Sequence, residues 1–263
     1  MAGIFQVLWG TGPGEFQEAK ALYGTDNEKL IIPYEGENET TKGICTRPWA
    51  VDWDSDGDLD LLVGNFEGTF FLFTGEGEGK FAPKPEQVMA DGEPLRIDGA
   101  HSDPMTVDWD GDGDIDVLSG SSSGGAQWAE NKADPGKIPE LAPFVRILPS
   151  QRYQEFGTLM NLEDLEGPTI NTRVWAADVN EDGKLDLLVG DSTALVSPAG
   201  GLNESQYKKA LANWQKEFKK VSRPVDDVEK DQERREKLND LYFQRSEFMN
   251  EDRTGFVWAY LRK

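Results

Sequence analysis

The amino-acid sequence predicts an all-β fold made of repeated units of short strands, with one α-helical hairpin inserted between strands. Three observations lead to this prediction: one segment occurs three times, glycine-rich turns separate short apolar runs, and one region has helical periodicity. The 263 residues include 28 Gly and 8 Trp, which is typical of many tight turns between strands with large side chains.

The repeated segment is the strongest signal. Its copies begin at Thr46, Ser102 and Thr172 and read TRPWAVDWDSDGDLDLLVG, SDPMTVDWDGDGDIDVLSG and TRVWAADVNEDGKLDLLVG. Their spacing fits a four-stranded unit with variable loops. The nearly continuous apolar run LDLLVG favours a strand that is buried on both faces, as in the stacked sheets of a propeller.

A second element also repeats. Gly3 to Phe16 aligns with Gly68 to Phe81, and each copy has an apolar strand, alternate glycines and a final Phe. The segment TGFVWAYLRK, residues 254–263, resembles the first half of this element and is expected to form a final propeller strand. Residues 1–202 are therefore predicted to form propeller blades, with half-units at both ends and about three and a half blades in all.

Residues 203–253 are predicted to be the inserted helical hairpin. Apolar side chains with alternate spacings of four and three form one stripe of a first helix, and they are Tyr207, Leu211, Trp214, Phe218 and Val221. Pro224 separates this helix from a second one with a looser stripe. The insertion has balanced charges, so the excess negative charge of the chain lies on the β part.

Each repeat contains a loop with oxygen-bearing side chains at positions 1, 3, 5 and 9 and a backbone carbonyl at position 7. The candidate metal ligands are Asp52, Asp54, Asp56, Asp58 and Asp60 in the first loop, Asp108, Asp110, Asp112, Asp114 and Asp116 in the second, and Asp178, Asn180, Asp182, Lys184 and Asp186 in the third. The residues at position 7, Asp58, Asp114 and Lys184, are expected to contribute the carbonyl.

This pattern indicates calcium. Ca²⁺ takes six to eight oxygen ligands, and alternate side chains along a tight loop surround one ion. A glycine at position 6 permits the sharp turn. The loops are not EF-hands, because strands flank them and position 12 is Val63, Ser119 or Val189 instead of Glu. We expect about three Ca²⁺ ions, with the weakest site in the third loop, where Asn180 replaces a carboxylate.

Composition excludes several classes of partner. The formal net charge of −22 argues against nucleic acid, whose phosphates would be repelled. No apolar run is long enough to span a bilayer, so membrane insertion is not expected. The first residues do not read as a signal peptide. We expect a protein that is exported to the periplasm, cell surface or medium, with its signal peptide absent from this chain.

The three loops resemble the FG-GAP/VCBS-type repeats of integrin α-subunit propellers, and those of bacterial VCBS-repeat proteins in particular. The resemblance rests on DWDSDGDLDLLVG, DWDGDGDIDVLSG and DVNEDGKLDLLVG and does not extend to the helical insertion. It implies a β-propeller with Ca²⁺ bracing each blade between its first and second strands. Such propellers usually have seven blades, so this chain is a fragment, an open arc, or a protomer that completes a ring.

Other functional residues are expected where the first strand of each unit begins. Arg47, Asp103, Arg173 and the neighbouring His101 would lie near the mouth of a central channel. They either bind an anionic or sugar ligand or pair with one another. Likewise, Trp49 and Trp175 either pack between blades or stack on sugars.

The sequence shows no catalytic constellation, since it has one His and one Cys and lacks the known nucleophile and phosphate-binding motifs. It therefore predicts a non-catalytic binding or structural module for a protein or glycan partner. Self-association through open blade edges is also expected. The alternative is a carbohydrate-binding module or the propeller part of a polysaccharide-degrading enzyme.

Overall fold

The computed structural model of the chain describes residues 3–34, 37–150, 155–223 and 228–263. The chain divides into two compact units, which we describe separately. The first contains Met1–Gln151, Pro168–Asp191 and Phe256–Lys263, and the second contains Arg152–Gly167 and Ser192–Gly255.

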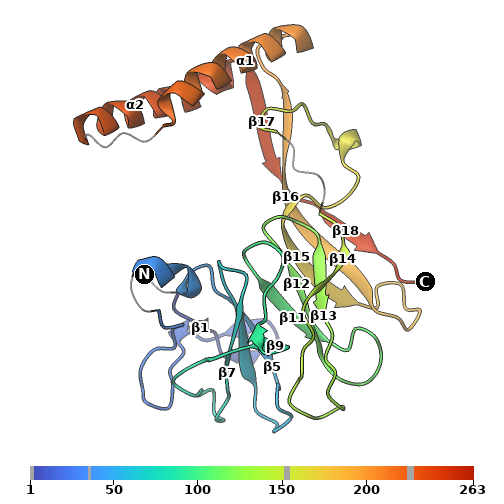
Figure 1. The fold of residues 1–263 in the computed structure, drawn as a ribbon. Helices are drawn as coiled ribbons and strands as arrows, with labels where there is room; N and C mark the ends of the chain where they lie inside the picture. The colour runs from blue at the N-terminus through green and yellow to red at the C-terminus, as the bar shows by residue number, and fades with distance from the viewer. Residues whose placement is uncertain (1–2, 35–36, 151–154, 224–227) are drawn as a thin grey trace. The chain divides into compact units, whose positions relative to one another are not determined.

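Two complete sheets of four antiparallel strands dominate the first unit (Figure 1). The strands of the first sheet, in spatial order, are β5 (Arg47–Val51), β6 (Asp60–Gly64), β7 (Phe70–Phe73) and β8 (Glu86–Gln87). The strands of the second are β11 (Asp103–Val107), β12 (Asp116–Gly120), β13 (Ala126–Ala129) and β14 (Val145–Leu148). The two sheets share one register, since Val51 pairs with Asp60 and Val107 pairs with Asp116.

The third repeat forms β15 (Ile170–Ala177) and β16 (Asp186–Pro198), which are neighbours in one sheet. Residues 187–190 of β16 also pair with β18 (Val257–Tyr260), which takes the place of a third strand. Of residues 254–263, which were predicted to form a final propeller strand, Val257–Tyr260 form β18.

The N-terminal residues form small strand pairs. β1 (Gln6–Val7) pairs with β4 (Lys20–Ala21), and β2 (Gly10–Gly12) pairs with β3 (Glu15–Phe16). The remaining short elements of this unit are the 3-10 helix η1 (Glu37–Gly43) and the paired strands β9 (Met89–Ala90) and β10 (Glu93–Pro94). The predicted mostly-β, propeller-like arrangement of four-stranded antiparallel sheets is confirmed.

Apolar side chains fill the space between successive sheets. The three clusters contain Phe5, Phe71 and Phe73 between β1 and the first sheet, Leu62, Phe70 and Val117 between the first and second sheets, and Leu118, Val174 and Val189 between the second sheet and the third repeat. The second strands of the first two repeats, β6 and β12, are buried because neighbouring elements cover both of their faces, as the nearly continuous apolar run predicts.

The glycine that ends this second strand allows the next sheet to approach. A Cβ on Gly64 would lie 2.3 Å from the carbonyl oxygen of Ser102, and one on Gly120 would lie 2.1 Å from that of Thr172. Both contacts are closer than a carbon and an oxygen can approach. Successive sheets therefore meet backbone against backbone at this position.

The second unit contains α1 (Glu204–Val221), α2 (Val228–Gln244), the 3-10 helices η2 (Leu162–Asp164) and η3 (Arg245–Glu247), and β17 (Met249–Thr254). Asn203 caps α1, since its side chain accepts the N–H of Gln206. The predicted range 203–253 contains both helices, but from Met249 onward it forms β17, which pairs with residues 193–198 of β16. Pro224 lies outside the described residues.

The apolar stripe of α1 forms the core of this unit. Tyr207 and Trp214 are buried, and Leu211 and Phe218 pack against them. The Tyr207 hydroxyl donates to the carbonyl of Gly157 at 2.6 Å, and the Trp214 indole donates to the carbonyl of Leu241 at 2.7 Å. These bonds satisfy the polar groups that the two aromatic side chains carry into the core.

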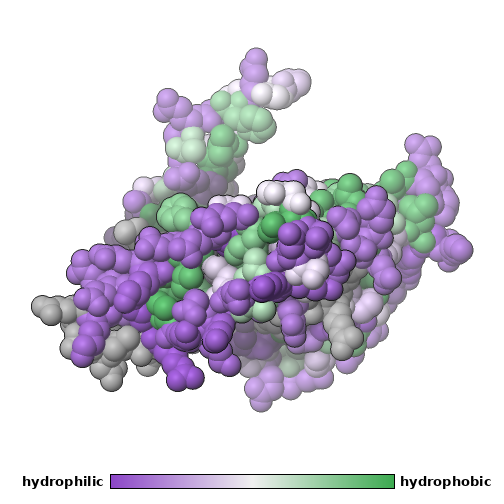
Figure 2. Space-filling model, turned by 90° about the horizontal axis from the view of Figure 1, so that it is seen from above, coloured by the Kyte–Doolittle hydropathy of each residue, from purple (hydrophilic) through white to green (hydrophobic). Residues whose placement is uncertain are grey.

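Hydrophilic residues predominate on the face seen in Figure 2, and hydrophobic residues gather in separate patches. This agrees with the strongly negative composition. Within the described part of the chain, neither helix is long and apolar enough to cross a membrane.

Candidate metal-binding loops

The three Asp-rich loops connect the first and second strands of their units and share one set of internal hydrogen bonds. The carboxylate at position 1 accepts the N–H of the glycine at position 6. The distances are 3.2 Å for Asp52 and Gly57, 3.1 Å for Asp108 and Gly113, and 2.8 Å for Asp178 and Gly183. These glycines have φ values of 95°, 98° and 85°, which a residue with a Cβ rarely adopts.

The side chains at positions 3 and 5 close successive turns. Each accepts the N–H of the residue two positions later, as Asp54 does from Asp56 and Asp56 does from Asp58. The same two bonds occur in the second and third loops. Short polar side chains favour such turns, so the alternating pattern folds the loop and turns oxygen atoms to one side.

The carboxylate at position 9 joins the loop to the sheet. One oxygen of Asp60 accepts the N–H of Trp53 at 2.7 Å, and the other accepts that of Gly75 at 2.7 Å. Asp116 and Asp186 make the equivalent pairs of bonds, with Trp109 and Asn131 and with Val179 and Arg262. All three carboxylates are buried. The sequence predicted these residues as ligands only, and this linking role was missed.

Replacing Asp60 with Ala is expected to cost about 2–5 kcal/mol of unfolding free energy, because two buried N–H groups lose their partner. Replacing Asp54 with Ala is the matched control, since Asp54 accepts one bond in an exposed turn. Its cost should stay below about 1 kcal/mol. Urea unfolding in excess chelator measures both values without a contribution from metal binding, and equal costs would contradict the linking role.

Several carboxylate oxygens in the loops have no partner in the part of the chain that the structure describes. They are Asp52 Oδ1 and both oxygens of Asp114, and all three atoms are buried. Buried carboxylate oxygens without a partner are costly, and a cation bound in the first loop would provide the missing interaction for Asp52, the residue at position 1. This chemistry fits Ca²⁺, whose ligands are oxygen atoms.

Two loops also bring carboxylates close together. Oxygens of Asp52, Asp54 and Asp60 lie within 4.8 Å of one another, and the same holds for Asp108, Asp110 and Asp112. The third loop, which lies within the described residues, does not form such a group of three. There the Asn180 amide donates to Asp182 at 3.2 Å, so one carboxylate oxygen is already engaged.

Burial favours the protonated form of three loop carboxyls, those of Asp60, Asp114 and Asp116, when no cation is bound. Burial, together with the charges of Asp112 and Asp116, raises the pKa of Asp114 to about 6. Burial also raises the pKa of Asp60 and of Asp116, although the backbone N–H groups that they accept oppose this shift. The loops therefore concentrate negative charge that a divalent cation would offset.

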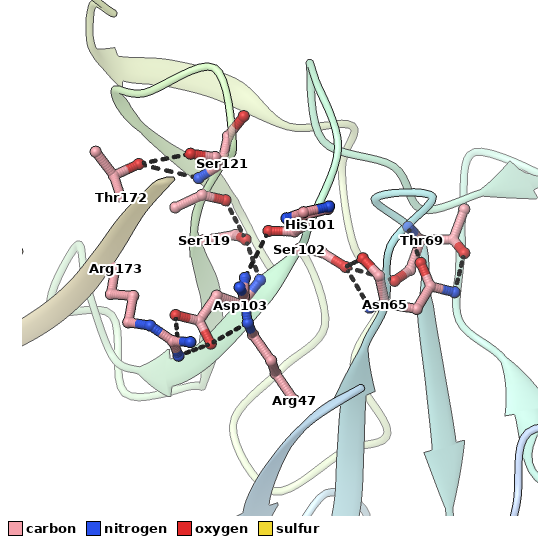
Figure 3. A network of polar contacts seen from close by, with 11 residues as sticks. Arg47, Asn65, Thr69, His101, Ser102, Asp103, Ser119, Ser121, Thr172 and Arg173 are labelled. Carbon is pink, nitrogen blue, oxygen red and sulfur yellow. Dashed lines mark hydrogen bonds and ion pairs between the residues drawn. The ribbon is translucent and has the colours of Figure 1, made fainter. Parts of the chain in front are cut away.

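The residues predicted near a channel mouth form a charge network (Figure 3). Arg173 donates to both oxygens of Asp103 at 3.0 Å, and Arg47 lies 3.9 Å from Asp103. Arg47 also donates to the backbone carbonyl of His101. The first strands of three successive units, β5, β11 and β15, supply Arg47, Asp103 and Arg173. The structure thus brings these three side chains together, while the ring of His101 packs against Phe66.

Hydroxyl groups beside this network link successive sheets. Ser102 donates to the carbonyl of Thr69 at 2.7 Å, and it accepts the N–H of Asn65 (Figure 3). Thr172 does the same in the next unit, where it donates to Gly125 and accepts the N–H of Ser121. The first residue of the second repeat and that of the third therefore tether their strands to the preceding sheet.

The two matching tryptophans lie side by side in different environments. The Trp49 indole donates to Thr106 at 2.9 Å and packs against two of the core clusters. The ring of Trp175 meets that of Trp49 edge to face, with centroids 5.6 Å apart, and 52% of Trp175 is exposed. Trp49 thus packs between sheets, whereas Trp175 has a large exposed surface.

The comparisons with known proteins agree with this geometry. Residues 52–119 and 108–189 match the FG-GAP-like repeat family, and each match runs from one loop into the next repeat. No curated protein and no solved structure matches the chain significantly. The bacterial VCBS type of the repeat stays a prediction. Because the two matches together cover more than half of the 263 residues, the chain belongs to the family of FG-GAP-like repeat proteins.

Proposed function

We propose that this protein is a non-catalytic binding or structural module in which Ca²⁺ braces the repeat units. The observation that carries the proposal is the clustering of carboxylate oxygens in the first two loops, within 4.8 Å of one another, together with the buried and unpartnered Oδ1 of Asp52 at position 1. A hard divalent cation takes ligands of this kind.

The position of the loops supports a bracing role. Each loop closes the connection between the first and second strands, and its position 9 carboxylate accepts the N–H of the residue two positions after the third strand ends. An ion held by the loop would therefore stiffen the inner strands of each sheet. We place the protein outside the cytoplasm, where calcium is abundant enough to fill sites of modest affinity.

Equilibrium dialysis with ⁴⁵Ca²⁺ tests the proposal. We expect about three bound ions per chain, in line with the loop count and the ligand chemistry. Asp54→Asn and Asp110→Asn should each weaken one site, whereas Glu18→Gln, an exposed charge outside the loops, should change nothing. Binding of no calcium at millimolar concentration would contradict the proposal.

The third loop is expected to be the weakest site, because it has three carboxylates and one amide where the others have four carboxylates. Asn180→Asp should raise its affinity several-fold. Isothermal titration of the wild type and this variant measures the change. A third loop that fills first in the wild type would contradict this order.

A further inference from the structure

A cavity of about 520 Å³ opens beside the first loop, and apolar side chains form most of its lining. On one side lie Phe5, Val7 and Trp9, which belong to β1 or flank it, and on the other lie Ala50, Leu59 and Leu61 of the first repeat. All of these residues are in the first unit. The cavity thus lies between part of the N-terminal strand pair and the loop end of the first complete sheet, beside the contact of Phe5 with Phe73.

The second repeat shows what normally covers these positions. Leu59 corresponds to Ile115, and Asp58 corresponds to Asp114. Leu59 is 61% exposed, whereas Ile115 packs against a core cluster that includes Trp53 and Leu62 of the preceding unit. Asp58 is exposed, whereas Asp114 is only 5% exposed. The loop end of the first repeat is therefore exposed at Asp58 and Leu59, where that of the second repeat is covered by its neighbour.

The N-terminal strand β1 has an unpaired edge beside this cavity, where Gln6 is one of the lining residues. We call this edge and the cavity together the gap. β1 pairs with β4, and Leu22 donates its N–H to the carbonyl of Phe5. In this antiparallel register the backbone groups of Gln6 turn away from β4, and no strand among the described residues pairs with that edge. When residues 3–16 are aligned with residues 68–81, Gln6 corresponds to Phe71, and Phe71 pairs with Val63 of β6.

The alignment also indicates a specific polar contact. Gly10 corresponds to Gly75, whose N–H donates to the position 9 carboxylate Asp60 at 2.7 Å. The counterparts in the next two units, Asn131 and Arg262, donate to Asp116 and Asp186 in the same way. An occupant of the gap that follows the repeat pattern would present an Asp to the N–H of Gly10.

We propose that this gap binds an extended strand that follows an Asp-rich loop, of the same repeat type as this chain's own and contributed by a partner polypeptide. Its backbone pairs with Gln6, its apolar side chains fill the cavity, and its position 9 Asp accepts the N–H of Gly10. A second copy of this chain is a poorer source. Its own strands of this type, β6, β12 and the first part of β16, each already lie between two neighbours.

A peptide with the sequence of residues 51–65, VDWDSDGDLDLLVGN, tests the proposal, because it is a loop and strand of the required type. A fluorescent label on the peptide allows its binding to the full chain to be followed by anisotropy. We expect saturable binding that the chain variant Leu59→Arg weakens at least tenfold. Ile138→Arg is the matched control, because Ile138 is 65% exposed and lies outside the cavity. The peptide variants Asp60→Asn and Leu62→Pro should also bind more weakly.

Hydrogen exchange supplies a second measurement, in which the peptide should slow exchange of the Gln6 and Gly10 amides. Titrations in calcium and in excess chelator separate this proposal from calcium binding by the chain. If the peptide binds in either condition and Leu59→Arg weakens this binding, the result supports strand binding in the gap, even if dialysis detects no calcium. Absence of binding in both conditions, or equal affinity of the two chain variants, would overturn it. The chain could also associate with itself. If Leu59→Arg abolishes this self-association and Ile138→Arg does not, the gap binds a second copy of the chain, and the assignment to a different partner is overturned.

Discussion

Excess chelator is expected to lower the melting temperature of the first unit by about 5–10 °C for each loop that loses a calcium ion. Saturation at about one hundred times the dissociation constant stabilises a folded protein by about 2.7 kcal/mol per site. In a unit of this size each kcal/mol changes the melting temperature by about 2–4 °C. The physical cause is the crowding of carboxylates, which repel one another when no cation lies between them.

Tryptophan fluorescence is a suitable signal for this measurement. Trp214 is the one Trp of the eight that lies in the second unit, so the emission reports mainly on the repeats. Mg²⁺ at the same concentration is the control, because it prefers octahedral geometry and retains its water, and it should restore less stability than Ca²⁺. A melting temperature that does not change between calcium and chelator would contradict the bracing role.

The internal geometry of the loops could be predicted from the sequence because it depends on local chemistry. Asp and Asn side chains bond to the backbone two residues ahead, and a glycine supplies the positive φ. These interactions span at most five residues, so the same pattern gives the same bonds in all three loops. The buried strand that follows was equally clear from its continuous apolar run.

Contacts between distant segments could not be predicted in this way. Asp103 meets an arginine from each neighbouring unit, and sequence spacing alone does not show that the strands which carry them begin side by side. Phe248 and Met249 fit the spacing of a helix, yet Met249 pairs with Pro198 in a strand because a partner strand is available there. The exposure of Leu59 depends on what covers it, and its sequence match with Ile115 does not reveal the difference.

The close approach of successive sheets leads to a prediction of similarly large effect. Gly120→Ala is expected to destabilise the first unit by about 3 kcal/mol, because a Cβ at this position meets only backbone atoms. It would lie 2.1 Å from the oxygen and 2.5 Å from the carbonyl carbon of Thr172, and neither atom can move aside as a flexible side chain can. The sheets would have to separate at β12 and β15, where Thr172 also makes its tethering bonds.

Gly190→Ala is the matched control within the same protein. Gly190 is the equivalent glycine of the third repeat, but among the described residues no atom beyond its own chain neighbours lies within 4 Å of the position that its Cβ would take. The substitution should therefore change the unfolding free energy by no more than about 0.5 kcal/mol. Urea unfolding followed by tryptophan fluorescence measures both variants. If both cost the same, the requirement for glycine would come from the strand itself. A cost confined to Gly120 would show that the requirement comes from the sheet packed against it.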